Sequence, residues 1–326
     1  MAVDGTQPAG TFYLMHTSDP ARSGPRHGDF AMAVSQLALL GGTGSVLFAN
    51  LPLTHHDALG IMSGFAVDDI DNADLTLLPG SFADHLTSYA ATFDDSSQTK
   101  MSRWISRGAS GTYGEVEEPC NYAEKFPSAR LHVEYPAGLS LGEAWFRSLE
   151  AVPFQGLFTG DPLTRPWARF PSVSVSVPGG AVSGTVVLTP VVAATASGAT
   201  IASVELLIDG VLWDTRAAGA SFALDTTALA EGWHELRVLA QDDSAVRNVG
   251  RWIGALEVDN GAPAVTLGCA TTTGDLATDF PLSVSATGGA VAELRVLHNG
   301  RVVAGAASAA ALLSVHGQNL GAGLHV

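Results

Sequence analysis

The sequence has few of the residues on which several common protein classes depend. Two cysteines in 326 residues are too few for a disulfide framework or for a zinc site built from cysteine pairs. Lysine and arginine number 16 against 32 aspartates and glutamates, a formal net charge of −16. Because such a field repels phosphate backbones and anionic headgroups, we expect no nucleic-acid partner.

Long apolar runs are also lacking. No stretch approaches 18 uninterrupted apolar residues, so we expect no membrane insertion, and residues Met1 to Asp4 show neither the basic nor the apolar part of a signal peptide. Hydrophobic residues nevertheless make up 46% of the chain. This content excludes overall disorder, and the length predicts two or three packed domains.

Residues 1–170 alternate between short apolar runs and helical patterns. Strands are expected at Thr11–His16, Ser45–Ala49, Asp74–Leu78 and Gly156–Thr159. Helices are expected after Asp29, over Gln98–Arg107 and after the capping box Ser140-Leu-Gly-Glu143. This alternation predicts an α/β domain with a mostly parallel sheet.

After Pro171 the apolar period changes to two. Val173, Val175 and Val177 alternate with serines, and Asp209-Gly210 supplies a type I′ hairpin turn. Short strands joined by Gly-, Thr- and Ser-rich connections predict a β-sandwich over residues 171–261.

The sandwich pattern then recurs. Asp209-Gly210 matches Asn299-Gly300, and Gly232-Trp233-His234 matches Gly323-Leu324-His325. In this register, residues 262–326 form a second module without the closing strands of the first. We therefore expect the second module to be truncated and its strand edges to be unpaired.

The repeat resembles bacterial immunoglobulin-like modules. The resemblance rests on the segments "IASVELLIDGVLWDT", "LDTTALAEGWHELRVLAQDD" and "EVDN". It implies extracytoplasmic spacer or adhesion modules in tandem, and a structural role for His234.

Residues 10–168 resemble an uncharacterised bacterial family that accompanies exosortase, the PEP-CTERM surface-sorting system. The matching segments are "LLPGSFADHLTSYAATF", "RWISRGASGTYGEVEEPCNYAEKFP", "SLGEAWFRSL" and "GLFTGDPLTRPWA". This resemblance implies a secreted, periplasmic or cell-surface protein and no known reaction. Since the family's domain extends further upstream, the first strands of the sheet could be missing here.

A more distant resemblance is to gingipain-like cysteine peptidases of the caspase fold. It rests on His85-Leu86-Thr87-Ser88, Gly108-Ala109-Ser110-Gly111 and Gly160-Asp161-Pro162. The position of the peptidase nucleophile holds His85, and that of the dyad histidine falls near Ser63-Gly64. The resemblance therefore implies a caspase-like fold whose usual dyad is absent.

A relocated dyad of His85 and Cys120 is the alternative. Both residues are expected at the carboxyl edge of the sheet, where an imidazole could activate the thiol and Asp84 could orient the ring. Substrate and oxyanion contacts would then come from Gly108, Ser110, Gly111 and Glu118. Structural roles explain the same residues, since a lone cysteine is usually a small buried hydrophobe and His85 can be a hydrogen-bonded core histidine.

Other polar groups are weaker candidates. An acidic site could be formed by Glu115, Glu117, Glu118 and His132, and a calcium loop by Asp68, Asp69, Asp71 and Asp74. His55-His56-Asp57 is interpreted as a polar helix start. Since solvated loops account for these patterns, we predict no metal site and no cofactor.

Three functions remain open at this stage. The first is a cysteine hydrolase, peptidase-like, that uses His85 and Cys120. The second is a non-catalytic α/β domain that recognises a protein or a cell-surface polymer, with the sandwiches as spacers. The third is a purely structural envelope protein. The missing dyad favours the second, in an extracytoplasmic bacterial protein.

Overall fold

The computed structural model describes residues 3–118, 120, 122–151, 155–261, 264–288 and 290–323. Its contacts divide the chain into two units, Met1–Arg169 and Phe170–Val326. None of the helices in the described ranges has the length and apolarity needed to cross a bilayer.

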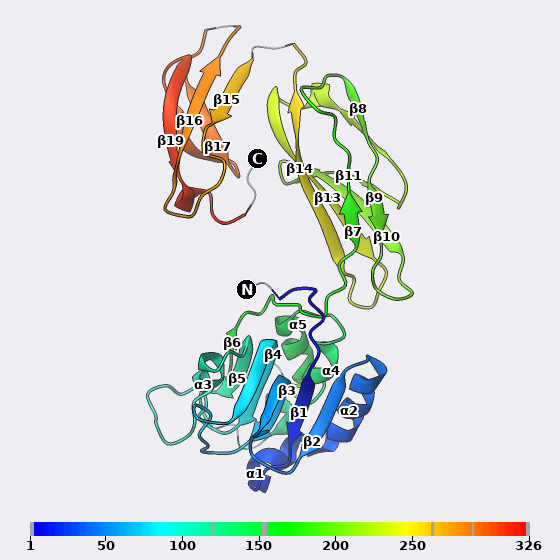
Figure 1. Cartoon of the computed structure of the whole chain (residues 1–326), viewed down its shortest axis with the longest axis vertical. Helices are drawn as coiled ribbons and strands as arrows, with labels where there is room; N and C mark the ends of the chain where they lie inside the picture. The colour runs from blue at the N-terminus through cyan, green and yellow to red at the C-terminus, as the bar shows by residue number, and fades with distance from the viewer. Residues whose placement is uncertain are drawn as a thin grey trace. The chain divides into compact units, whose positions relative to one another are not determined.

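The first unit is built on one six-stranded sheet with the order β2-β1-β3-β4-β5-β6 (Figure 1). The strands are β1 (Thr11–Met15), β2 (Thr43–Leu47), β3 (His55–Gly64), β4 (Leu75–Leu86), β5 (Gly111–Glu115) and β6 (Gly156–Gly160). All neighbours pair in parallel except β5 and β6, which are antiparallel. The predicted mostly parallel sheet is therefore present, with one antiparallel edge strand.

Two predictions were wrong in the region of β3 and β4, one about the extent of a strand and one about a helix start. The run expected to end at Leu78 continues as β4 to Leu86, so His85 lies within the strand. His55-His56-Asp57 opens β3 and starts no helix. In both places small residues break the apolar pattern, yet the backbone stays extended because Ala58–Phe65 and Gly80–Ser88 are almost entirely buried between neighbouring strands and helices.

Helices cover both faces of this sheet. On one face, α2 (Phe30–Leu39) and the short α4 (Leu131–Glu134) pack over Leu14 and Met62, and α5 (Leu141–Ser148) adjoins α4. On the other face, α3 (Ser102–Ser106) buries Trp104 against Ala83. α3 is shorter than predicted, whereas the predicted capping box of α5 is present.

The first sandwich of the second unit contains eight strands. They are β7 (Ser172–Ser174), β8 (Thr185–Leu188), β9 (Val191–Ala193), β10 (Ile201–Ile208), β11 (Val211–Arg216), β12 (Phe222–Asp225), β13 (Gly232–Asp242) and β14 (Val249–Val258). A sheet of order β11-β10-β13-β14 shares an apolar core with the pairs β12-β8 and β7-β9. Asp209 and Gly210 both have positive φ, as the predicted I′ turn requires.

The remaining strands repeat part of this pattern. They are β15 (Val265–Cys269), β16 (Asp279–Ala286), β17 (Leu294–His298), β18 (Arg301–Ala306) and β19 (Ala310–His316). Asn299 and Gly300 repeat the positive-φ turn. Leu324 and His325, which carry the end of the predicted repeat, lie outside the described residues, and the boundaries of the two modules stay predictions.

Candidate functional site

His85 is held by contacts on all sides of its ring. Trp104 Nε1 donates to Nδ1 over 3.0 Å, and Nε2 lies 3.0 Å from the carbonyl oxygen of Thr99. Because indole nitrogen only donates, Nδ1 accepts and Nε2 carries the ring hydrogen. Phe65 stacks on the ring at 4.5 Å. Burial lowers the pKa of His85 to about 4. The ring is therefore neutral, and both of its nitrogens are hydrogen bonded.

Asp84 points to the opposite face of β4, since successive strand residues alternate. Its Oδ2 accepts from Arg26 over 2.7 Å in an ion pair that is almost wholly buried. Arg26 also donates to the carbonyl oxygens of Ser63 and Pro127. Burial raises the pKa of Asp84, and Arg26 opposes this shift. The structure thus pairs Asp84 with Arg26, and does not bring its carboxylate to His85.

Cys120 lies beyond the end of β5 and is exposed. The expectation that this cysteine is buried is therefore wrong. Its backbone amide donates to Glu118 Oε1 over 3.0 Å. In the part of the chain that the structure describes, no hydrogen bond or ring contact joins Cys120 to His85. The dyad itself stays a prediction that this geometry does not support.

The predicted oxyanion loop is at the wrong edge of the sheet. Gly108, Ser110 and Gly111 precede or begin β5, whereas Cys120 follows it. The amide of Gly108 donates to Ile105 and that of Ser110 to Ser81, so two of the three proposed donors are already used. Since β5 lies between this loop and Cys120, the oxyanion role of Gly108, Ser110 and Gly111 stays a prediction that this geometry does not support.

The acidic site, a weaker candidate around Glu115, is not assembled by the described residues. Glu115 is fully buried at the end of β5, while Glu117 is exposed and accepts from Gln155 Nε2. Glu118 is exposed and bonded to the Cys120 amide. His132 is buried on α4, where burial lowers its pKa to about 3. The prediction assumed an extended segment past Glu115, but the strand ends there.

At the carboxyl edge of the sheet, the chain fills its own crevice. Open α/β sheets bind ligands outside the carboxyl ends of the strands, at the point where the strand order reverses, which here lies between β1 and β3. Here α1 (Pro20–Ser23) packs on that point, and a Cβ added at Gly64 would lie 2.3 Å from the carbonyl oxygen of Arg22. Thr17 Oγ1 donates to Gly64 O, and Arg22 Nε donates to Thr87 Oγ1.

An open pocket remains beside this point, between the loops that follow β3 and β4. Its volume is about 260 Å³, and its polar lining includes Asp68, Asp69, Asp71, Lys100 and Arg103. Arg103 pairs with Asp71 at 2.8 Å, and Lys100 Nζ donates to the carbonyl oxygen of Tyr89. The pocket therefore presents carboxylates and cations side by side.

Three of the four carboxylates considered as a calcium loop line this pocket, but each has its own partner. Asp68 accepts from Asn50, Asp69 accepts from Asn72, and Asp71 pairs with Arg103. Asp74 lies 3.6 Å from His56 instead. Within the described ranges, no group of three or more His, Cys, Asp or Glu side chains is arranged to hold a metal ion.

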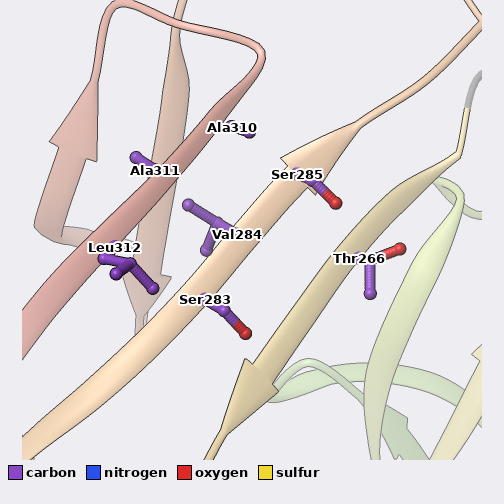
Figure 2. Close-up of a pocket in the computed structure, with 7 residues that line it drawn as sticks. All are labelled: Thr266, Ser283, Val284, Ser285, Ala310, Ala311 and Leu312. Atoms are coloured by element: carbon purple, nitrogen blue, oxygen red, sulfur yellow. The ribbon is translucent and has the colours of Figure 1, made fainter.

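A second groove crosses the sheet formed by β15, β16 and β19. It measures about 480 Å³, and Figure 2 shows its lining side chains on the three strands. They are Thr266, Ser283, Val284, Ser285, Ala310, Ala311 and Leu312. Hydroxyl and apolar groups line this groove, which offers contact surface but no acid, base or nucleophilic thiol.

Sequence reasoning missed Arg26 and Tyr113, which organise the interior of the first unit. Arg26 is 5% exposed, although arginine is almost never buried unless paired. Its partner Asp84 is 58 residues away in sequence. No local pattern could have identified this pair.

Comparison with known proteins identifies the class of one module. Residues 171–238 match a family model described as a bacterial Ig domain. None of the curated proteins compared with the chain matches it. The first sandwich is thus an immunoglobulin-like module of bacterial type, in agreement with the resemblance stated above.

Solved structures that match parts of the chain do so at low identity and low TM-score. Fibronectin(III)-like modules of Clostridium thermocellum CbhA are 21% identical over 32% of this chain and 53% of that chain, with a TM-score of 0.23. A Ca²⁺-stabilised adhesin of an Antarctic bacterium is 22% identical over 46% and 41%, with a TM-score of 0.21. A 1.5-MDa bacterial ice-binding adhesin is 19% identical over 42% and 48%, with a TM-score of 0.17. The chain spans about half the length of these structures or less.

Proposed function

We propose that this chain is an extracytoplasmic, surface-associated bacterial protein whose α/β unit recognises a partner without catalysis. The immunoglobulin-like modules act as spacers or adhesion modules. The observation that carries this proposal is the state of His85. A neutral ring with a donor on one nitrogen and an acceptor on the other has no site left to take a proton from a thiol.

The proposed origin of the α/β unit is a caspase-like fold that has lost its dyad. The mostly parallel sheet with an antiparallel last strand supports this origin. So does the register of β3 and β4, in which Ser63 pairs with His85. These are the two places to which the gingipain-like resemblance assigned the dyad residues. The exosortase-associated resemblance of residues 10–168 supports the proposed surface location.

The partner proposed for the pocket after β3 and β4 is a polar surface component, either a protein or a hydroxyl-rich cell-surface polymer. Both need donors and acceptors close together, which Asp69, Asp71 and Arg103 provide. The exposed fraction of the Asp71–Arg103 pair, 43% and 55%, leaves hydrogen-bonding capacity for a ligand.

The test measures how much of the whole chain is retained on cell-envelope fractions. Polysaccharides and envelope proteins are tested as separate fractions. We expect Asp69→Asn combined with Arg103→Gln to abolish retention, because both polar sides of the pocket change. Glu150→Gln, at an exposed acid outside the pocket lining, is the matched control and should bind as the parent does.

Two results would overturn the proposal. Unchanged retention of the pocket variant would exclude this pocket as the recognition surface. It would favour the purely structural function. Hydrolysis of acyl or peptide substrates that disappears in Cys120→Ser would instead establish the cysteine hydrolase.

A further inference from the structure

Tyr113 and Glu115 form a buried hydrogen-bonded pair on β5 that the proposed function does not use. The Tyr113 hydroxyl is hydrogen bonded to Glu115 Oε1 and also lies 2.6 Å from the carbonyl oxygen of Lys125. Glu115 is fully buried, and its other oxygen, Oε2, has no partner among the described atoms. One phenol thus stands between two oxygens.

The number of hydrogens decides which protonation state fits this arrangement. A phenol has one hydrogen, and a carbonyl oxygen only accepts. If Glu115 is ionised, one hydrogen must serve two contacts between three oxygens. If Glu115 carries a proton on Oε1, the acid donates to Tyr113 and Tyr113 donates to Lys125. Only the protonated acid gives each contact its own hydrogen.

The surroundings favour the same state. Burial raises the pKa of Glu115 to about 7, against the opposing effects of its hydrogen bond with Tyr113 and the charge of Lys125. Burial and the neighbouring carboxyl also raise the pKa of Tyr113, so the phenol keeps its hydrogen. The other charged groups acting on Tyr113 are Asp84 and Arg26.

Several other described contacts of the pair are with uncharged residues. Trp145 of α5 and Phe126 contact the Tyr113 ring, and Gly156 of β6 lies against its hydroxyl. On the other face of β5, Gly114 meets Ala90 and Met101. The charged groups named for the pair are therefore Lys125, Asp84 and Arg26.

We propose that protonated Glu115 ties the short turn η2 (Ala123–Lys125) to β5, and that loss of this proton releases the tie. Ionised Glu115 takes the phenol hydrogen in a charge-assisted bond, which leaves the Lys125 carbonyl without that donor. The turn is then held by other contacts, among them the Ala151 amide donating to Glu124 O. The pair is thus a pH-sensitive contact between η2 and the carboxyl end of β5, and it does not depend on a binding partner.

Hydrogen exchange of the whole chain tests the release. At about pH 5.5 and about pH 8.5, on either side of a pKa of about 7, the amides of Lys125 and Phe126 are compared after correction for chemical exchange. We expect about fivefold lower protection at the higher pH, as loss of one hydrogen bond implies. Infrared spectroscopy in parallel should show a protonated carboxyl band that disappears over the same pH range.

Variants assign the effect to the pair. Glu115→Gln keeps the shape and donates at every pH, so it should stay protected at both pH values and lack the infrared band. Tyr113→Phe removes both contacts and should show the lower protection at both pH values. Glu124→Gln, an exposed acid of the same turn, is the matched control and should keep the step.

The proposal fails if Glu115→Gln keeps the pH step of the parent chain, or if the protonated carboxyl band is absent at the lower pH. If Tyr113→Phe does not fold, Glu115→Gln and the infrared band still decide. Neither result depends on whether the pocket binds a partner.

Discussion

The α/β unit and the first immunoglobulin-like module bury polar groups in different ways. The α/β unit buries titratable side chains in its core, among them Arg26, Asp84, His85, Glu115 and His132. In four of these five, all except His85, at least one polar atom has no partner among the described residues. In the module, buried apolar residues alternate with more exposed residues along β10 and β13. Its buried polar residues lie at turns or near strand ends, and they are Thr226, His234, Asp242 and Asn248.

Two of the buried histidines, His85 of the α/β unit and His234 of the module, differ in their hydrogen-bond partners. The ring of His85 faces one donor and one acceptor, an arrangement that a neutral ring satisfies. The ring of His234 faces the carboxylate of Asp209 at 2.6 Å and the carbonyl oxygen of Ala230 at 2.9 Å. Both partners of this ring are acceptors, whereas one of the two partners of the His85 ring is a donor. The α/β unit is therefore the part of the chain whose stability should respond to charge and acid.

The largest expected effect comes from breaking the buried ion pair. Asp84→Leu leaves the Arg26 guanidinium buried without its carboxylate, and should cost the α/β unit about 3–5 kcal/mol of unfolding free energy. Adding Arg26→Met should recover most of this loss, because the charge is also removed. Unfolding of each unit is followed by hydrogen exchange in urea.

The matched control is Arg216→Met in the immunoglobulin-like module. Its partner Asp214 lies 2.7 Å away in an exposed pair, for which a loss below about 1 kcal/mol is expected. Equal losses from Asp84→Leu and Arg216→Met would contradict the contrast between the units.

Acid should unfold the α/β unit before the module. A folded-state pKa of about 4 for His85 lies below the ordinary value of 6.5, so the contribution of the neutral ring is present above 6.5 and is lost as pH falls. The loss reaches about 3 kcal/mol near pH 4. His132 acts in the same direction.

Glu115 acts in the opposite direction. Its folded-state pKa is raised from 4.5 to about 7, so its contribution is present below 4.5 and is lost as pH rises through 7. The two histidines together outweigh it below pH 6.5. His132→Leu should reduce the acid sensitivity, measured as the urea midpoint against pH, and an unchanged profile would contradict this account.

The smallest expected effect is the loss of a helix cap. Ser140 Oγ accepts from the Glu143 amide, and Glu143 Oε2 accepts from the Ser140 amide. Ser140→Ala should cost the α/β unit about 1 kcal/mol. Asp225→Ala, which removes the cap of the three-residue turn η3 (Thr226–Ala228) in the module, should cost less. A larger loss from Asp225→Ala in thermal unfolding would reverse the order.

Local patterns predicted the elements that depend on local chemistry. The capping box of α5 and the two hairpin turns at Asp209-Gly210 and Asn299-Gly300 are in place, because caps and positive-φ turns are decided within a few residues. The period of two along Ile201–Ile208 likewise predicted a strand with one buried face. The lengths of β3 and β4 were predicted less well, because they depend on burial between neighbouring strands and helices.

The candidate site was predicted far less well than the fold. The sequence drew attention to His85, Cys120, Asp84 and the Gly108–Gly111 loop. It could not show that Trp104 and Thr99 engage both nitrogens of His85, or that β5 separates the loop from Cys120. These relations depend on contacts between distant segments, which no periodicity records.

The sequence by itself determined the two kinds of architecture, because hydrophobic period and turn chemistry are properties of short segments. It also determined the acidity of the chain. Only the tertiary structure decided the environment of each titratable group. Burial and hydrogen-bond partners fix whether a side chain is neutral, paired or available, and for Asp84, His85 and Glu115 those partners or neighbours come together only when the sheet and its helices pack.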